Sequence, residues 1–428
     1  MLVYLLLSIF TFSVVISTLF GMLMLIGSSM YDVAQEQSKK RPGGVSRSYI
    51  GRYRPLVSIV IPAFNEELSI ERCLDGLKKL RYRKIEIIIA DDKSTDNTRQ
   101  IVRRYIKENP KRNIKLVCKR NNGGRGAAIN LGVKHASGEI ISAFDADCFY
   151  EPRAIHNLVA RFADPEVAAV AANVRILKSN TVLGMMQRLE YMISFRSKKF
   201  NTVTESEYII GGAGASYRSS VLKSAGGFDE SMKTEDIEFS IRLARLLGKD
   251  SKLLYASDYV VHTEPVPTYK GLFRQRYRWK FGSLQALYKN RSVIFSRQSN
   301  QNKFMGWVRL PLALWSEFML LLEPFLFGMF VYIALAKGNP WLFIGACLTY
   351  AVVTWLALWS DEHLSLLSKL QLSWLAPFMY VASFVISIVQ VSAAFRSLIN
   401  LKGITGRRSI SGAYKTTQRF KSTLEVSS

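Results

Sequence analysis

The sequence predicts an α/β domain with a doubly wound sheet, joined to an α-helical membrane region. Short apolar runs alternate with helical patterns between residues 56 and 144, and acidic pairs follow two of these runs. Four longer stretches are apolar and nearly free of charge. Alternating strands and helices are typical of a parallel sheet, whose ligands bind at the carboxyl ends of the strands. We therefore expect both acidic pairs at that edge of the sheet.

The composition excludes two simple classes of protein. Hydrophobic residues make up 49% of the 428-residue chain but gather in a few stretches, so neither a purely soluble enzyme nor a purely membranous transporter fits. The net charge of +25 favours anionic partners such as phosphates or acidic lipids. Basic flanks of membrane helices are the alternative explanation. No nucleic-acid motif accompanies the charge, so we expect no nucleic-acid partner. The four cysteines lack metal-ligand spacing and favour a reducing compartment.

The N-terminal stretch is predicted to cross a membrane. Residues 2–27 carry no charge, and a bilayer needs about 20 apolar residues. The basic residues come after this stretch, unlike those of a signal peptide: they are Lys39, Lys40, Arg41, Arg47, Arg52 and Arg54. We therefore predict a transmembrane helix over 1–30 with its N-terminus outside, and a basic cytoplasmic linker over 31–54.

The middle of the chain carries the strand and helix patterns. Continuous apolar runs predict buried parallel strands at 56–62, 85–90, 114–118 and 139–144. Asn65 is expected to cap a helix with Ile70, Leu74 and Leu77 on one face. Helices are also predicted over 95–108 and 123–136. After residue 170 helices dominate the prediction: 181–204, 234–247 and 269–297, the last basic, aromatic and suited to a membrane surface.

The C-terminal part contains three further apolar stretches, at 310–336, 340–360 and 372–395. Three crossings after a cytoplasmic domain would leave the C-terminus outside. The tail from residue 401 holds six Lys and Arg against one acidic residue, which favours the inside. An interfacial or re-entrant stretch, or an extra break near Pro324, would reconcile the two.

Two acidic pairs and an arginine suit the binding of a nucleotide diphosphate. Asp145 and Asp147, two apart after a strand, can ligate Mg²⁺ or Mn²⁺. Asp91 and Asp92 can accept hydrogen bonds from a base or a ribose. Arg125 stands among glycines at a helix start, where a diphosphate can bind. Each has a plainer reading: turn residues for the aspartates and an exposed loop side chain for the arginine.

Two further clusters suit the acceptor side of a transfer reaction. Thr234 can cap a helix with Glu235 and Asp236 in its first turn, or Asp236 can serve as a general base. The run 275–279 places Gln275, Arg278 and Trp279 on one helix face, where the indole can stack on a sugar. An aromatic anchor at a membrane surface is the alternative for this run.

Taken in order, these clusters resemble the processive family 2 glycosyltransferases: the cellulose, chitin, hyaluronan and poly-N-acetylglucosamine synthases. Segments 57–66, 121–130, 226–229 and 264–265 also resemble that family, and the similarity covers roughly residues 55–295. The resemblance implies a GT-A-like doubly wound mixed sheet with interfacial helices, plus the transmembrane region. The expected domains are 1–30 transmembrane, 31–54 linker, 55–267 cytoplasmic GT-A domain, 268–305 interfacial helices, 306–400 about three transmembrane helices, and 401–428 basic tail.

The resemblance also implies roles for the site residues. Asp91 and Asp92 would hold the uridine of a UDP-sugar, with Arg125 and Asp145 also on the nucleotide. Asp145 and Asp147 would hold the metal, Mg²⁺ or Mn²⁺. Asp236, with Glu235 beside it, would be the catalytic base. The acceptor and diphosphate residues would be Gln275, Arg276, Arg278 and Trp279. Many relatives have Lys in place of Arg125, so the contact geometry of this residue is open.

The expected function is elongation of a β-linked polysaccharide from a UDP-sugar, with UDP-N-acetylglucosamine the best candidate, coupled to export. The expected location is the plasma membrane, multi-pass, with a cytoplasmic catalytic domain. The partners implied are a growing glycan or lipid acceptor, membrane lipids and, in addition, an accessory membrane subunit. Two alternatives stand beside this: a non-processive lipid glycosyltransferase acting on ceramide or another lipid, and a non-enzymatic membrane scaffold. Product length and UDP release discriminate among the three.

Overall fold

The structure is a computed structural model. It describes residues 2–40, 52–336, 338, 341–400 and 404. Apart from residue 404, the predicted basic tail lies outside the described residues, as do residues 41–51 of the predicted linker.

One eight-stranded mixed sheet forms the centre of the molecule, in the order β3-β2-β1-β4-β7-β6-β8-β5. Its strands are β1 (Val57–Ala63), β2 (Ile85–Asp91), β3 (Ile114–Cys118), β4 (Ile140–Ala143), β5 (Cys148–Tyr150), β6 (Val167–Ile176), β7 (Ala215–Arg218) and β8 (Lys252–Thr263). Strands β1 to β4 are mutually parallel where they pair. Strand β7 is antiparallel to both β4 and β6, and β8 is parallel to β6. The predicted mixed α/β sheet is therefore confirmed.

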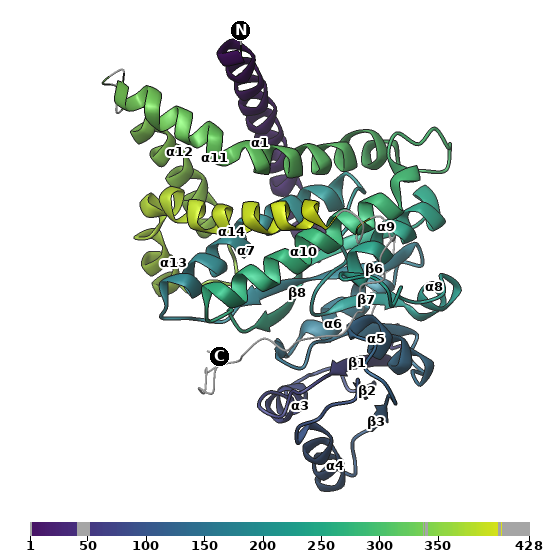
Figure 1. The fold of residues 1–428 in the computed structure, drawn as a ribbon. Helices are drawn as coiled ribbons and strands as arrows, with labels where there is room; N and C mark the ends of the chain where they lie inside the picture. Colours follow the sequence, from purple (N-terminus) through teal and green to yellow (C-terminus); the bar gives the residue numbers. More distant parts are fainter. Residues whose placement is uncertain (1, 41–51, 337, 339–340, 401–403, 405–428) are drawn as a thin grey trace.

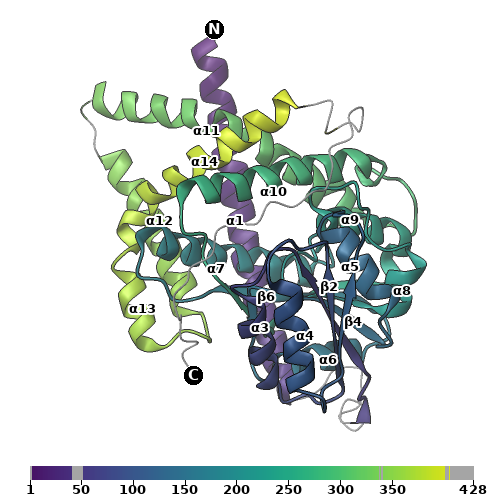
Figure 2. The same ribbon diagram turned by 60° about the horizontal axis from the view of Figure 1, so that its bottom comes forward.

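The central strands are mostly apolar because both faces of the sheet are covered. Ile59 and Ile61 of β1 pack on one face, while Val60 between them packs on the other. The first face carries α3 (Ile70–Lys78), α4 (Thr98–Glu108) and α6 (Ala154–Phe162), and Figure 2 shows α3 and α4 side by side there. The second carries α5 (Arg125–Lys134), α8 (Ser219–Ser224) and α9 (Glu235–Leu247).

Two sequence expectations about these elements are wrong. Asn65 does not cap α3, which begins at Ile70 after Ser69. Asn65 instead adopts a φ of 57° and accepts a hydrogen bond from the Thr95 backbone N–H, which ties together the loops after β1 and β2. The expectation that helices dominate after residue 170 is also wrong, because it misses strands β6, β7 and β8. These strands pair across long stretches of chain, so a local apolar pattern does not reveal them.

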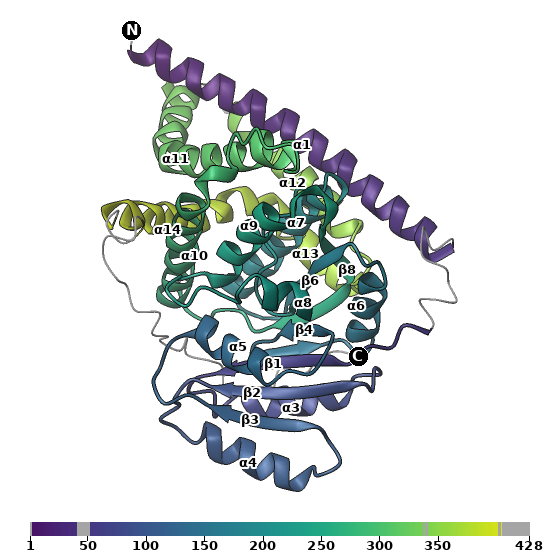
Figure 3. The same ribbon diagram turned by 90° about the vertical axis from the view of Figure 1, so that its right-hand side faces the viewer.

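The remaining helices form a second region beside the sheet (Figure 1). They are α1 (Leu2–Lys40), α7 (Val182–Val203), α10 (Tyr269–Lys289), α11 (Leu310–Ala336), α12 (Trp341–Trp359), α13 (Leu366–Ser373) and α14 (Met379–Ile399). Short helical turns lie at η1 (Gly248–Asp250), η2 (Arg291–Val293), η3 (Met305–Arg309) and η4 (Ala376–Phe378). In Figure 3, α1 runs along the outside of this region. Helix α10 packs between α9 and α14.

The apolar helices give limited support for membrane crossing. Within the described residues, the stretch Met305–Leu322 is long and apolar enough to span a bilayer, judged by length and composition alone. The stretch Ile386–Ile399 is apolar but shorter.

Candidate active site

A cavity of about 1350 Å³ lies where the strands end. Strands β1, β2 and β4 run in one direction, and two successive antiparallel pairings give β6 and β8 that direction too. The carboxyl ends of all five strands therefore meet at one edge, where ligands bind in such sheets. Ten of the predicted site residues line the cavity: Asp92, Arg125, Asp145, Asp147, Glu235, Asp236, Gln275, Arg276, Arg278 and Trp279.

The two neighbouring aspartates at the end of β2 have different tasks. Asp92 lines the cavity and accepts hydrogen bonds from the backbone N–H groups of Gly123 (2.9 Å) and Gly124 (2.6 Å), just before α5. Burial raises the pKa of its carboxyl group, although these bonds and Lys119 act in the opposite direction. Asp91 does not line the cavity. It is fully buried and accepts bonds from Lys93, Ser94 and Arg99, so it holds the turn after β2 together.

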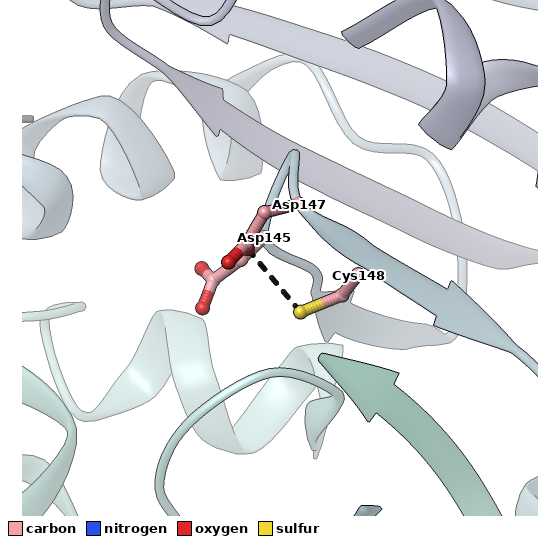
Figure 4. Close-up of side chains that lie close together, drawn as sticks. All are labelled: Asp145, Asp147 and Cys148. Atoms are coloured by element: carbon pink, nitrogen blue, oxygen red, sulfur yellow. Dashed lines mark hydrogen bonds between the residues drawn. The ribbon is translucent and has the colours of Figure 1, made fainter. Parts of the chain in front are cut away.

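Asp145 and Asp147 lie together after β4 (Figure 4). A carboxylate oxygen of each and the Cys148 sulfur all lie within 4.8 Å of one another. Burial raises the pKa of the Cys148 thiol well above its usual value, so the sulfur stays protonated and donates to Asp147 Oδ1 at 3.3 Å. Hard carboxylate oxygens suit Mg²⁺ or Mn²⁺, whereas a protonated thiol does not. The donor set therefore fits a divalent ion held by the two aspartates.

Arg125 cross-links the acidic groups around the cavity. Its Nε donates to Asp145 Oδ1 at 2.9 Å, and its Nη1 donates to Glu235 Oε1 at 2.5 Å. Burial alone would lower the pKa of this guanidinium, but the surrounding carboxylates, Asp236 included, outweigh burial and raise it. Arg125 is therefore a permanent positive charge between the end of β4 and the start of α9.

Glu235 and Asp236 are adjacent in the chain and both line the cavity, but they differ in burial and in partners. Glu235 is buried and paired with Arg125, and burial raises its pKa against the effect of that arginine. Asp236 is partly exposed, and its Oδ2 accepts from the backbone N–H of Gly212 at 2.9 Å. A Cβ at Gly211 would lie 2.9 Å from that oxygen, so the glycine leaves room for the carboxylate.

Helix α10 brings the 275–279 run to the other side of the cavity. Gln275, Arg278 and Trp279 line the cavity from one helix, as the spacing predicts. The helix comes very close to the start of α9, because a Cβ at Gly282 would overlap the Thr234 side chain. The site of Asp236 and the site of Trp279 are thereby held at a constant separation.

Arg276 also lines the cavity, and it has a partner that the sequence does not reveal. Its guanidinium donates to Glu190 Oε2 of α7 at 2.6 Å and lies 4.5 Å from the centre of the Trp279 ring. The sequence reasoning missed Glu190, which lies within a long helical pattern and has no motif around it. It also missed Gly211 and Gly212, although two adjacent glycines before a strand are a usable sign of a close approach.

Comparison with known proteins agrees with this geometry. Residues 58–226 match the family described as Glycosyl transferase family 2. These residues form a family 2 glycosyltransferase domain. The domain contains Asp92, Arg125, Asp145 and Asp147, whereas Asp236 and helix α10 follow it in the chain.

Curated relatives extend the family 2 similarity beyond that domain. The chain is 30% identical over 289 residues to the poly-beta-1,6-N-acetyl-D-glucosamine synthase of Staphylococcus aureus (strain COL), covering 65% of this chain and 63% of the relative. It is 31% identical over 244 residues to the synthase of that name from Staphylococcus epidermidis, covering 55% and 56%. The chain thus spans less than two thirds of the length of these relatives.

A solved structure supports the fold of the glycosyltransferase domain and its surroundings. The mannosyltransferase PcManGT from Pyrobaculum calidifontis, in complex with GDP-Man and Mn²⁺, superimposes with a TM-score of 0.56 at 22% identity. The match covers 88% of this chain and 96% of that one. The likeness establishes a shared fold that includes the GT-A-like sheet.

Proposed function

We propose that the protein is a membrane-bound, inverting glycosyltransferase that extends a β-linked glycan from a UDP-sugar, with UDP-N-acetylglucosamine as the preferred donor. The observation that carries the proposal is the single cavity that receives all four predicted clusters. The names of the staphylococcal relatives support N-acetylglucosamine as the sugar. We divide the cavity into a donor half (Asp92, Arg125, Asp145 and Asp147) and an acceptor half (Asp236, Gln275, Arg276, Arg278 and Trp279).

The donor half binds and orients the nucleotide. Asp92 accepts a hydrogen bond from the uridine, since its carboxylate is held in place by the two backbone N–H groups before α5. Asp145 and Asp147 would hold Mg²⁺ or Mn²⁺. A bound ion would neutralise the negative charge of the diphosphate. Arg125 adds a fixed positive charge beside Asp145.

The acceptor half performs the proton transfer. Asp236 takes the proton from the attacking hydroxyl group of the acceptor. A bond forms between that oxygen and the anomeric carbon, while the bond from this carbon to the diphosphate oxygen breaks and UDP leaves. A single displacement inverts an α-linked donor into a β-glycoside. Trp279 stacks on the acceptor sugar, and Gln275 and Arg278 bind its polar groups or the diphosphate.

We propose a multi-pass protein of the plasma membrane, and contacts of the C-terminal helices support a C-terminus on the side of the catalytic domain. Arg175 of β6 makes a bidentate pair with Asp361 at 2.9 and 3.0 Å, so the turn after α12 lies on the side of the catalytic domain. Helix α14 packs along α10, and the Asn400 side chain at its end donates to the Tyr277 hydroxyl at 3.1 Å. If α1, α11 and α12 cross the membrane and α14 lies at its surface, the basic tail is inside.

Incubation of the purified full-length protein with a panel of UDP-sugars and Mg²⁺ or Mn²⁺ tests the proposal. We expect UDP release with UDP-N-acetylglucosamine and a long product that an N-acetylglucosamine-specific glycosidase digests. A product that carries a single sugar on a lipid would show that the protein glycosylates lipids and does not synthesise a polymer. Absence of UDP release with every donor would leave only a scaffold function.

A further inference from the structure

A chain of contacts from α14 through α7 ends at the ring of Trp279. Gln390 of α14 donates to Glu190 Oε1 at 3.4 Å. The other oxygen of Glu190 accepts from Arg276 at 2.6 Å, and the Arg276 guanidinium lies 4.5 Å from the centre of the Trp279 ring. Three helices, which lie beside one another in Figure 1, are thus linked by side-chain contacts to the cavity-lining indole.

The ion pair between Arg276 and Glu190 is well shielded from water. The Arg276 side chain is 7% exposed and that of Glu190 is 24% exposed. A charge pair at this depth is screened less by salt than a surface pair, and the loss of one partner leaves the other charge poorly compensated. Arg276 therefore has one stable position while Glu190 is ionised, and that position is over the ring.

The contact between Arg276 and the ring restricts the indole. A guanidinium stacked within about 6 Å of an aromatic face is attracted to it, and more strongly when water is excluded. An indole restrained in this way loses less conformational freedom when a sugar stacks on its open face. A residue that fixes the guanidinium therefore improves acceptor binding without touching the acceptor.

We propose that Glu190 is a positioning residue, which holds Trp279 in its acceptor-binding orientation by fixing Arg276. The inference depends on the proposed acceptor role of Trp279. Gln390 extends the arrangement to α14, so the packing of a C-terminal helix influences how tightly the acceptor sugar binds.

The test is kinetic and uses the full-length protein, UDP-N-acetylglucosamine, and a β-1,6-linked N-acetylglucosamine tetrasaccharide as acceptor. The Glu190→Gln variant keeps the size of the side chain and one acceptor oxygen but removes its charge. We expect the acceptor KM to rise about tenfold, because Arg276 loses its ion pair and keeps at most a hydrogen bond to a neutral amide. The donor KM is expected to stay within about twofold, because the donor half is unchanged.

Two further variants separate positioning from general damage. Asp258→Asn breaks a second, more exposed arginine–carboxylate pair, Arg161–Asp258 at 2.9 Å, whose residues do not line the cavity. We expect it to lower thermal stability without changing the acceptor KM. In a Trp279→Leu background, Glu190→Gln should add no further effect, since the ring through which it acts is gone.

The outcomes are distinguishable. If Glu190→Gln changed kcat and both KM values in parallel, or added its full effect without Trp279, the positioning role would be wrong. If the wild-type protein transferred no sugar, the proposed function would be wrong, yet titration of tryptophan fluorescence with the tetrasaccharide would still test the positioning role. If the Glu190→Gln variant binds the tetrasaccharide more weakly than the Asp258→Asn variant, the positioning role of Glu190 is supported. If the two variants bind the tetrasaccharide equally well, that role is contradicted.

Discussion

The donor half and the acceptor half of the cavity are built differently. The donor-half carboxylates follow β2 and β4, Arg125 begins α5, and Asp92 is held by backbone N–H groups just before that helix. Most acceptor-half side chains lie on α10, which is held to its neighbours by side-chain pairs such as Arg276–Glu190 and Lys280–Glu317. Strand register restrains the first half, whereas helix packing sets the second. We therefore expect the donor half to tolerate changes in the helices, and the acceptor half to respond to them.

The largest effect is expected at Asp236, the proposed catalytic base in the acceptor half. Asp236→Asn should lower turnover by about 10³-fold, within the range for loss of a general base, because an amide cannot take the proton. Donor affinity, measured by calorimetry with the UDP-sugar and metal, should be retained. Turnover close to that of the wild type would exclude Asp236 as the base.

A change at Asp147 should disable the donor half alone. Asp147→Asn removes one of the two carboxylates that suit a divalent ion, so metal affinity should fall by about tenfold or more. Mn²⁺ binding can be followed by electron paramagnetic resonance with the nucleotide present. Acceptor binding, followed by tryptophan fluorescence, should not change. Unaltered Mn²⁺ affinity would place the metal elsewhere.

A methyl group at Gly211 should shift the base without removing it. The Cβ would come within 2.9 Å of Asp236 Oδ2, so Gly211→Ala should reduce kcat by about tenfold through misplacement of the carboxylate. Gly21→Ala is the control, because nothing lies within 4 Å of a Cβ at that position. Equal activity of the two variants would contradict the close approach at Asp236.

The smallest effect on activity is expected at the contact between the sheet and α12. The Arg175–Asp361 pair is largely buried, so Asp361→Asn should cost about 3 kcal/mol of stability, with kcat unchanged. Burial tends to raise the pKa of Asp361, but Arg175 outweighs it and the net shift is downward. The stabilisation is therefore present above the usual pKa of about 3.9 and is lost as the pH falls below it. Thermal denaturation in detergent should show a lower Tm for Asp361→Asn than for the wild type at pH 7, and a smaller Tm difference below about pH 4. A Tm difference that stayed constant over this pH range would contradict an ionic origin of the stabilisation.

The sequence predicts the donor half better than the acceptor half for a physical reason. The first four strands are short apolar runs, and acidic pairs mark the ends of the second and the fourth, so the position of Asp145 and Asp147 follows from local pattern. Strands β6 to β8 depend on partners far along the chain and give no comparable local signal. Glu190 acquires its importance only from the packing of α7 against α10, which no spacing in the sequence reveals.

The sequence alone does not distinguish Asp91 from Asp92, since both follow the same apolar run. The direction in which each side chain leaves the strand end separates them, and Asp91 binds the turn instead of lining the cavity. Successive residues of a strand alternate between its two sides, so only one of two adjacent carboxylates is expected to face a ligand.

The most direct test of the account is an experimental structure of the full-length protein with UDP-N-acetylglucosamine and Mg²⁺. The account predicts the uracil beside Asp92, the diphosphate beside Asp145 and Asp147, and the anomeric carbon facing the space between Asp236 and Trp279. A donor bound away from this cavity, or an anomeric carbon that Asp236 cannot reach through an acceptor hydroxyl, would contradict it.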